Sequence, residues 1–127
     1  MKIDPLSSDS DDLPSMALTT AAELLDRFLV RARHALGPDV TALRLHILLN
    51  VLANEGINQR KLLNLLDMTS ITALSRNLAD MSLLTSSKKP GPGLIELRFD
   101  AMNMRQKSIH LTPKGRKIVS AIVQPGI

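Results

Sequence analysis

The spacing of the hydrophobic residues changes period twice along this chain, and these changes restrict the possible folds more than any other feature. Up to about residue 84, apolar side chains recur three and four positions apart, which predicts helices. After the segment Lys-Lys-Pro-Gly-Pro-Gly at 88–93, residues 94–99 and 107–111 alternate between apolar and polar, which predicts two strands joined as a β-hairpin. A helical pattern returns from Pro113. The sequence therefore predicts an α+β fold, mostly α, with four helices, a β-hairpin and a C-terminal helix.

Capping residues indicate where these helices begin and end. Thr20 and Glu23 have the form of a capping box, and Gly37 follows the last periodic residue, so the first helix is expected over 20–36. The second is expected to end before residue 56, and the fourth to reach about residue 84. The caps expected for the second, third and fourth helices are Asp39 or Thr41, Asn58, and Thr69 or Ser70.

Charge is distributed unevenly along the 127 residues. Residues 1–15 contain one lysine and four aspartates among serines and prolines, so we expect a disordered acidic tail there and one domain over 16–127. The whole chain has a net charge of +4, and residues 76–117 hold nine basic residues against three acidic ones. A basic block of this kind suits a polyanionic partner such as nucleic acid.

Several classes of protein are disfavoured by what the sequence lacks. It has no cysteine, its three histidines are scattered, and no pair of carboxylates or nucleophile motif suggests hydrolysis, so we expect neither a metal site, a cofactor nor an enzyme. No apolar run approaches the roughly 20 residues that cross a bilayer, and the N-terminus lacks the apolar stretch of a secretory signal. A cytoplasmic location is expected.

The fourth helix is amphipathic in a way that suits DNA. Its apolar stripe holds Ile71, Leu74, Leu78 and Met81. The major groove is about 12 Å wide and admits one α-helix, whose exposed side chains then meet the base edges. A short helix, a turn, a polar-faced helix and a basic hairpin together predict a winged helix-turn-helix. The opposite, polar face of the fourth helix holds Thr69, Thr72, Ala73, Arg76 and Asp80.

Candidate DNA-binding residues come from three segments. Arg76 suits a bidentate contact to guanine, unless it instead pairs with Asp80 four residues later. The lysines before the first strand either contact DNA or only increase solubility. The full set is Thr69, Ser70, Thr72, Ala73 and Arg76 on the helix, Lys88 and Lys89 in the loop, and Arg105 and Lys107 on the wing.

The segment from Asn58 to Val119 resembles the winged-helix domain of MarR-type transcriptional regulators. The run Ser-Ile-His-Leu-Thr-Pro-Lys-Gly-Arg at 108–116 is similar to that family's last strand and the "LTPKG" that opens the next helix. Residues 78–84 resemble the end of its recognition helix. The resemblance implies that Arg105 is the wing-tip arginine. Typical members continue into long C-terminal dimerisation helices, so a dimer of this shorter chain would depend more on the helix over 20–36.

These features predict a regulator, most simply a repressor, that binds duplex DNA as a homodimer; no small-molecule effector can be named. Binding to single-stranded nucleic acid is disfavoured, because it usually needs aromatic platforms and the chain has no Trp, no Tyr and two Phe. The alternative from another class is a winged helix that binds proteins, as an adaptor or anti-regulator.

Overall fold

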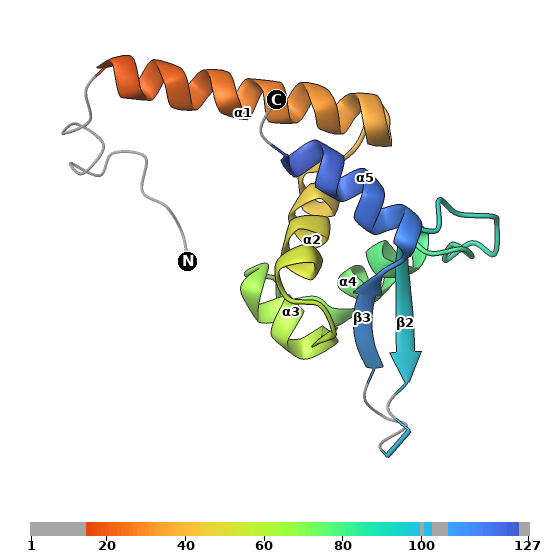
Figure 1. The fold of residues 1–127 in the computed structure, drawn as a ribbon. Coiled ribbons are helices and arrows are strands. Elements are labelled where there is room, and N and C mark those ends of the chain that lie inside the picture. The colour runs from red at the N-terminus through yellow and green to blue at the C-terminus, as the bar shows by residue number, and fades with distance from the viewer. Residues whose placement is uncertain (1–14, 100, 103–106, 125–127) are drawn as a thin grey trace.

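The computed structural model describes residues 15–99, 101–102 and 107–124, and Figure 1 shows how they are arranged. The expected acidic tail lies, apart from Ser15, outside these residues. The elements follow in the order α1 (Ser15–Leu36), α2 (Ala42–Ala53), β1 (Ile57–Asn58), α3 (Gln59–Leu65), α4 (Ile71–Asp80), β2 (Ile95–Phe99), β3 (Lys107–Leu111) and α5 (Pro113–Val123). The predicted fold class is confirmed, with one further short strand. No helix among the described residues is long and apolar enough to cross a membrane.

The first helix starts earlier than its capping pattern predicts. It begins at Ser15, and the hydroxyl of Thr19 donates to the Ser15 carbonyl at 3.0 Å inside the first turns. Residues 16–18 are Met, Ala and Leu, all good helix formers, so the helix continues toward the N-terminus past the expected start. Thr20 and Glu23 therefore lie within α1 and do not form its cap.

The next three helices begin at residues that the sequence offered as caps. The side chains of Thr41, Asn58 and Ser70 each accept a hydrogen bond from the backbone N–H three residues later. Helix α4, however, ends at Asp80 and does not reach residue 84. The carbonyl of Met81 accepts the N–H groups of Leu94 and Ile95, at 2.7 and 3.1 Å, which ties the chain to the start of β2 and ends the helix.

The sheet has three antiparallel strands in the order β1-β3-β2. The hairpin pairs Ile95 with Leu111 at one end and Phe99 with Lys107 at the other. Strand β1 adds Ile57 opposite Ile109. The sequence did not predict β1, because two residues are too few to show an alternating pattern.

The main core lies between α2, α3, α4, the sheet and the N-terminal part of α5. Leu74 and Leu78 of α4 are fully buried in it, whereas Ile71, expected on the same stripe, is 45% exposed at the start of the helix. Helix α5 packs so closely on the sheet that a Cβ on Gly115 would lie 2.0 Å from the carbonyl oxygen of Leu94. The largest fully buried side chains are Ile47, Leu48, Val51, Leu62, Leu74, Leu78, Ile95, Ile109 and Val119.

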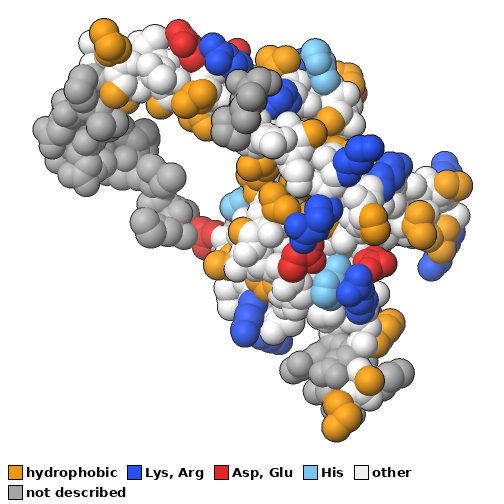
Figure 2. All heavy atoms as spheres, viewed as in Figure 1, with side chains coloured by type: hydrophobic (Ala, Val, Ile, Leu, Met, Phe, Trp, Pro, Cys, Tyr) orange, Lys and Arg blue, Asp and Glu red, His pale blue; other side chains and the backbone are white. Residues whose placement is uncertain are grey.

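Among the described residues, only the C-terminal part of α1 packs against the other elements. Ala32 is buried with Leu45 of α2 and Ile122 of α5, and Arg31 Nε donates to the carbonyl of Ile122 at 2.9 Å. The N-terminal part extends beyond the other elements (Figure 1), and hydrophobic side chains are visible along it in Figure 2. The large apolar residues that α1 leaves exposed are Met16, Leu18, Leu24, Leu25, Leu29 and Val30.

Candidate nucleic-acid interface

Helices α3 and α4 form the helix-turn-helix unit. Leu62 and Leu66 anchor α3 in the core, and the chain then turns through Asp67, whose φ of 54° lies in the left-handed region. Gln59 at the start of α3 donates a hydrogen bond to the hydroxyl of Ser75 in α4. The two helices are therefore held together both through the core and across their exposed side.

The polar face of α4 is presented to solvent much as its sequence predicts. Thr69, Ser70, Thr72 and Arg76 are exposed, and Ala73 is half-buried. Because Leu74 and Leu78 fix the opposite side of the helix in the core, these residues have one defined direction. The structure thus places Thr72, Ala73 and Arg76 on one side of α4, with Thr69 and the N-cap Ser70 exposed just before its first residue.

Arg76 is not paired with Asp80, so this alternative interpretation of Arg76 is wrong for the structure. Asp80 instead forms an ion pair with Arg44 of α2 at 3.4 Å and accepts two hydrogen bonds from Ser86. Those two bonds hold the pKa of Asp80 below its usual value, and the charges of Arg44 and, last, Arg76 lower that pKa further. Within the described ranges the Arg76 guanidinium makes no hydrogen bond or ion pair.

The sequence predicts two basic DNA-binding residues on the wing, and Lys107 is the one that lies within the described residues. Lys107 is exposed at the start of β3, with Nζ 5.3 Å from the centroid of the Phe99 ring. Arg105 lies outside the described residues. Arg98 is also on the wing, but its Nε donates to Glu96 at 2.8 Å. Among the described residues, Lys107 therefore forms no ion pair with a carboxylate, whereas Arg98 of the same wing pairs with Glu96.

Lys88 and Lys89 lie on a second projection, between α4 and β2. Leu84 and Pro90 form an antiparallel bridge, Thr85 N–H donates to the Lys89 carbonyl at 2.9 Å, and Lys88 has a φ of 64°. Figure 1 shows this loop near the start of β2, while the wing extends from the other end of the strand. The structure therefore does not bring the two lysines together with Lys107.

Sequence reasoning did not single out Glu55, which links the end of α2 to the wing strand and α5. One carboxylate oxygen accepts from Arg116 at 2.7 Å and from the Leu111 N–H at 3.3 Å. The other lies 3.3 Å from Nδ1 of His110, whose Nε2 is 2.8 Å from the Ser108 hydroxyl. Leu111 and Arg116 are 56 and 61 positions from Glu55, so no local pattern in the sequence indicates them.

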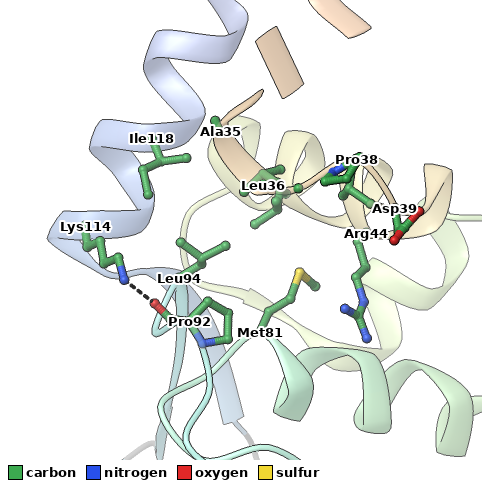
Figure 3. A pocket seen from close by; sticks show the side chains of 13 residues that line it. Ala35, Leu36, Pro38, Asp39, Arg44, Met81, Pro92, Leu94, Lys114 and Ile118 are labelled. Atoms are coloured by element: carbon green, nitrogen blue, oxygen red, sulfur yellow. Dashed lines mark hydrogen bonds between the residues drawn. The ribbon is translucent and has the colours of Figure 1, made fainter. Parts of the chain in front are cut away.

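A cavity of about 390 Å³ lies between the α1–α2 turn, α2 and the N-terminal part of α5. Figure 3 shows its apolar wall, which includes Leu36, Leu94 and Ile118, and two basic side chains at its edges. Lys114 donates to the carbonyl of Pro92 at 2.8 Å, and Arg44 extends toward α4. The part of the chain that the structure describes contains no cluster of three or more His, Asp or Glu placed to hold a metal ion.

Comparison with known proteins supports this fold. A scan against protein-family models finds no match for the sequence, and a search of curated proteins finds none. Among solved structures, MepR of S. aureus in complex with DNA is 26% identical, with a TM-score of 0.56 over 85% of this chain and 79% of that one. A MarR-family transcription regulator is 25% identical, with a TM-score of 0.56 over 94% of this chain and 73% of that one.

The transcriptional repressor CouR, solved on a 23-mer DNA duplex, shares the fold at 22% identity, with a TM-score of 0.55 over 96% of this chain and 77% of that one. Two of these neighbours are named as transcriptional proteins, one a MarR-family transcription regulator and the other a repressor, and MepR and CouR are both solved with DNA. The matched regions cover 85–96% of this chain. The chain is a MarR-like winged helix-turn-helix protein.

Proposed function

We propose that this chain is a sequence-specific regulator of transcription that binds duplex DNA and acts as a repressor by occluding a promoter. The observation that carries the proposal is the exposed polar face of α4, on which Arg76 has no ion-pair partner among the described residues. The MarR-like fold supports it, since MepR and CouR are both solved with DNA. The proposed activity is binding without catalysis or cofactor, in the cytoplasm.

In this proposal, α4 enters the major groove. Arg76 makes a bidentate contact to a guanine edge, because its guanidinium is exposed and directed by a helix that the core holds in place. Thr69, Ser70 and Thr72 contact phosphates or base edges near the start of the helix, and the small Ala73 lets the helix approach closely. These contacts would provide the sequence preference.

The wing and the loop are proposed to contact the backbone at separate places. Lys107 and Arg105 reach the phosphates or the adjacent groove, which adds affinity for all sequences alike. Lys88 and Lys89 extend from the other end of β2, so any phosphates that they contact differ from those at the wing tip.

The proposed functional unit is a homodimer held mainly by α1. Leu18, Leu25 and Leu29 lie on the same face of α1 as the buried Ala32, but beyond the part that α5 covers. A second copy would cover this exposed apolar stretch. Two-fold symmetry would then place the two recognition helices about 34 Å apart, on half-sites separated by one turn of DNA.

Selection of bound duplexes from a random library, followed by affinity measurements at several salt concentrations, tests this function. The proposal expects a preferred sequence bound roughly 10³-fold or more above scrambled duplex, with affinity that falls steeply with salt. A protein-binding adaptor would show little salt-dependent binding to any duplex. The exposed apolar surface of α1 would then be the place to look for its protein partner.

A further inference from the structure

Asp80 joins three segments that are far apart in the chain. It ends α4, its Oδ1 accepts the Ser86 N–H at 2.9 Å and the Ser86 hydroxyl at 2.7 Å, and its Oδ2 faces Arg44 Nη2 of α2 at 3.4 Å. A carboxylate at the C-terminal end of a helix is unfavourable against the helix dipole. Asp80 is stabilised there by these partners from outside α4.

Without these partners, Asp80 has an obvious alternative. Arg76 lies four residues earlier on α4, which is the spacing at which side chains on a helix are neighbours. The Arg76 charge already lowers the pKa of Asp80, the smallest of the influences on it. A released Asp80 could therefore pair with Arg76, and the guanidinium would have to break that pair before it could bind a base.

Arg44 contacts Asp80 through one end of its guanidinium. Its Nε is buried and has no hydrogen-bond partner among the described residues, while Nη2 reaches Asp80. Figure 3 shows the side chain at the edge of the cavity, away from the apolar wall that includes Leu36 and Ile118. A buried N–H without a partner is unfavourable. Among the described residues, the ion pair and hydrogen bond with Asp80 are the polar contacts that the Arg44 guanidinium makes.

We propose that Arg44 and Ser86 are positioning residues that keep Asp80 away from Arg76, so that the Arg76 guanidinium stays available for DNA. Neither residue needs to touch DNA in this role. The inference rests on the proposed function, because it assumes that Arg76 reads a base.

Three variants test it with different charge changes: Arg44→Gln removes a positive charge, Asp80→Asn removes a negative one, and Ser86→Ala changes none. We expect Arg44→Gln to weaken binding to the preferred duplex about two- to fivefold, the range for an ion pair that solvent partly screens, and Ser86→Ala to weaken it about twofold. Asp80→Asn should bind at least as tightly as the parent, and adding it to Arg44→Gln should restore binding. Thermal unfolding checks that each variant is folded.

Matched controls separate positioning from net charge. Lys117→Gln removes an exposed charge on α5, and Ser87→Ala removes the neighbouring loop hydroxyl. A reduction in affinity with Lys117→Gln equal to that with Arg44→Gln, or no reduction with Ser86→Ala, would overturn the proposal in favour of simple electrostatics. If Asp80→Asn lowers the affinity for the preferred duplex as much as Arg44→Gln does, the proposal is wrong, and the ion pair acts instead by holding α2 and α4 together.

A further arm uses Arg76 itself. If Arg44 acts through Arg76, the loss of affinity caused by Arg76→Ala should be smaller in the Arg44→Gln protein than in the parent. The two losses should differ by the same two- to fivefold factor. Equal reductions in both backgrounds would show that Arg44 acts elsewhere. If Arg76→Ala leaves the affinity of the parent unchanged, Arg76 does not read a base, and the positioning role is wrong as well. The proposed function is tested separately, by whether the parent protein binds a preferred duplex more tightly than a scrambled one.

Discussion

The ammonium group of Lys107 lies 5.3 Å from the centroid of the Phe99 ring, and the two residues are direct partners in the register of β2 and β3. Phe99 is 58% exposed, although the alternating pattern placed it on the same side as the buried Ile95. An aromatic ring attracts a cation over its face. The exposed phenylalanine is thus part of the wing surface and not of the core. Its ring attracts the Lys107 ammonium group and favours a position over the ring face.

The wing should contribute affinity without sequence preference. Replacing Arg105 and Lys107 together by Ala is expected to weaken binding to all duplexes alike, because phosphates carry no sequence information. The slope of log affinity against log salt should become shallower by about 0.9 for each phosphate that the wing no longer neutralises. Salt titrations on selected and scrambled duplexes measure both effects, with Lys117→Ala on α5 as the control. An unchanged slope would mean that the wing does not touch the backbone.

Arg76 should contribute sequence preference. Arg76→Ala is expected to weaken binding to the preferred duplex by roughly 1–3 kcal/mol, the range for removing a bidentate hydrogen bond to a base, and to relax preference at that base pair. Binding to scrambled DNA should change much less. Affinities for the two duplexes give the comparison, and Arg33→Ala on α1 serves as the matched control. Equal affinity of variant and parent for the preferred duplex would remove Arg76 from the readout.

The exposed stretch of α1 should be needed for self-association. Leu25 is 64% exposed on the face that continues toward Ala32, so Leu25→Glu is expected to give a monomer by placing a charge in the proposed interface. Arg27→Glu introduces the same side chain on the other side of the helix and should leave the dimer intact. Light scattering at micromolar concentration reports the mass of each. A monomeric parent, alone and on DNA, would contradict the dimer.

Gly115 should be intolerant of even one added carbon. In a helix, Ala is usually favoured over Gly by about 1 kcal/mol. Here the new Cβ would lie 2.0 Å from the Leu94 carbonyl oxygen, a backbone atom that cannot simply rotate away. We expect the overlap to prevail and Gly115→Ala to destabilise the fold by about 1–3 kcal/mol. Chemical denaturation measures this against Ser120→Ala on the exposed side of α5, and a variant as stable as the parent would refute the close packing.

Much of the fold followed from local patterns, and the two misplaced helix ends have physical explanations. Asn58 and Ser70 are caps that each bond an N–H three residues away, so the sequence could indicate both helix starts. The start of α1 was misjudged because a capping pattern can also occur within a longer helix. The end of α4 was misjudged because the Met81 carbonyl pairs with residues 94 and 95, beyond any local window.

For the candidate site, the sequence by itself determined which side chains share the polar face of α4, since a period of 3.6 residues places Thr72 and Arg76 on the same side. Only the tertiary structure decided that Asp80 pairs with Arg44, 36 positions away, and not with Arg76. Only the tertiary structure likewise decided which part of α1 is exposed, because the sequence of an apolar stripe is the same whether or not α5 covers it. Helical periodicity is a property of neighbours in the chain, whereas the choice of an ion-pair partner or a packing surface depends on where distant segments come to lie.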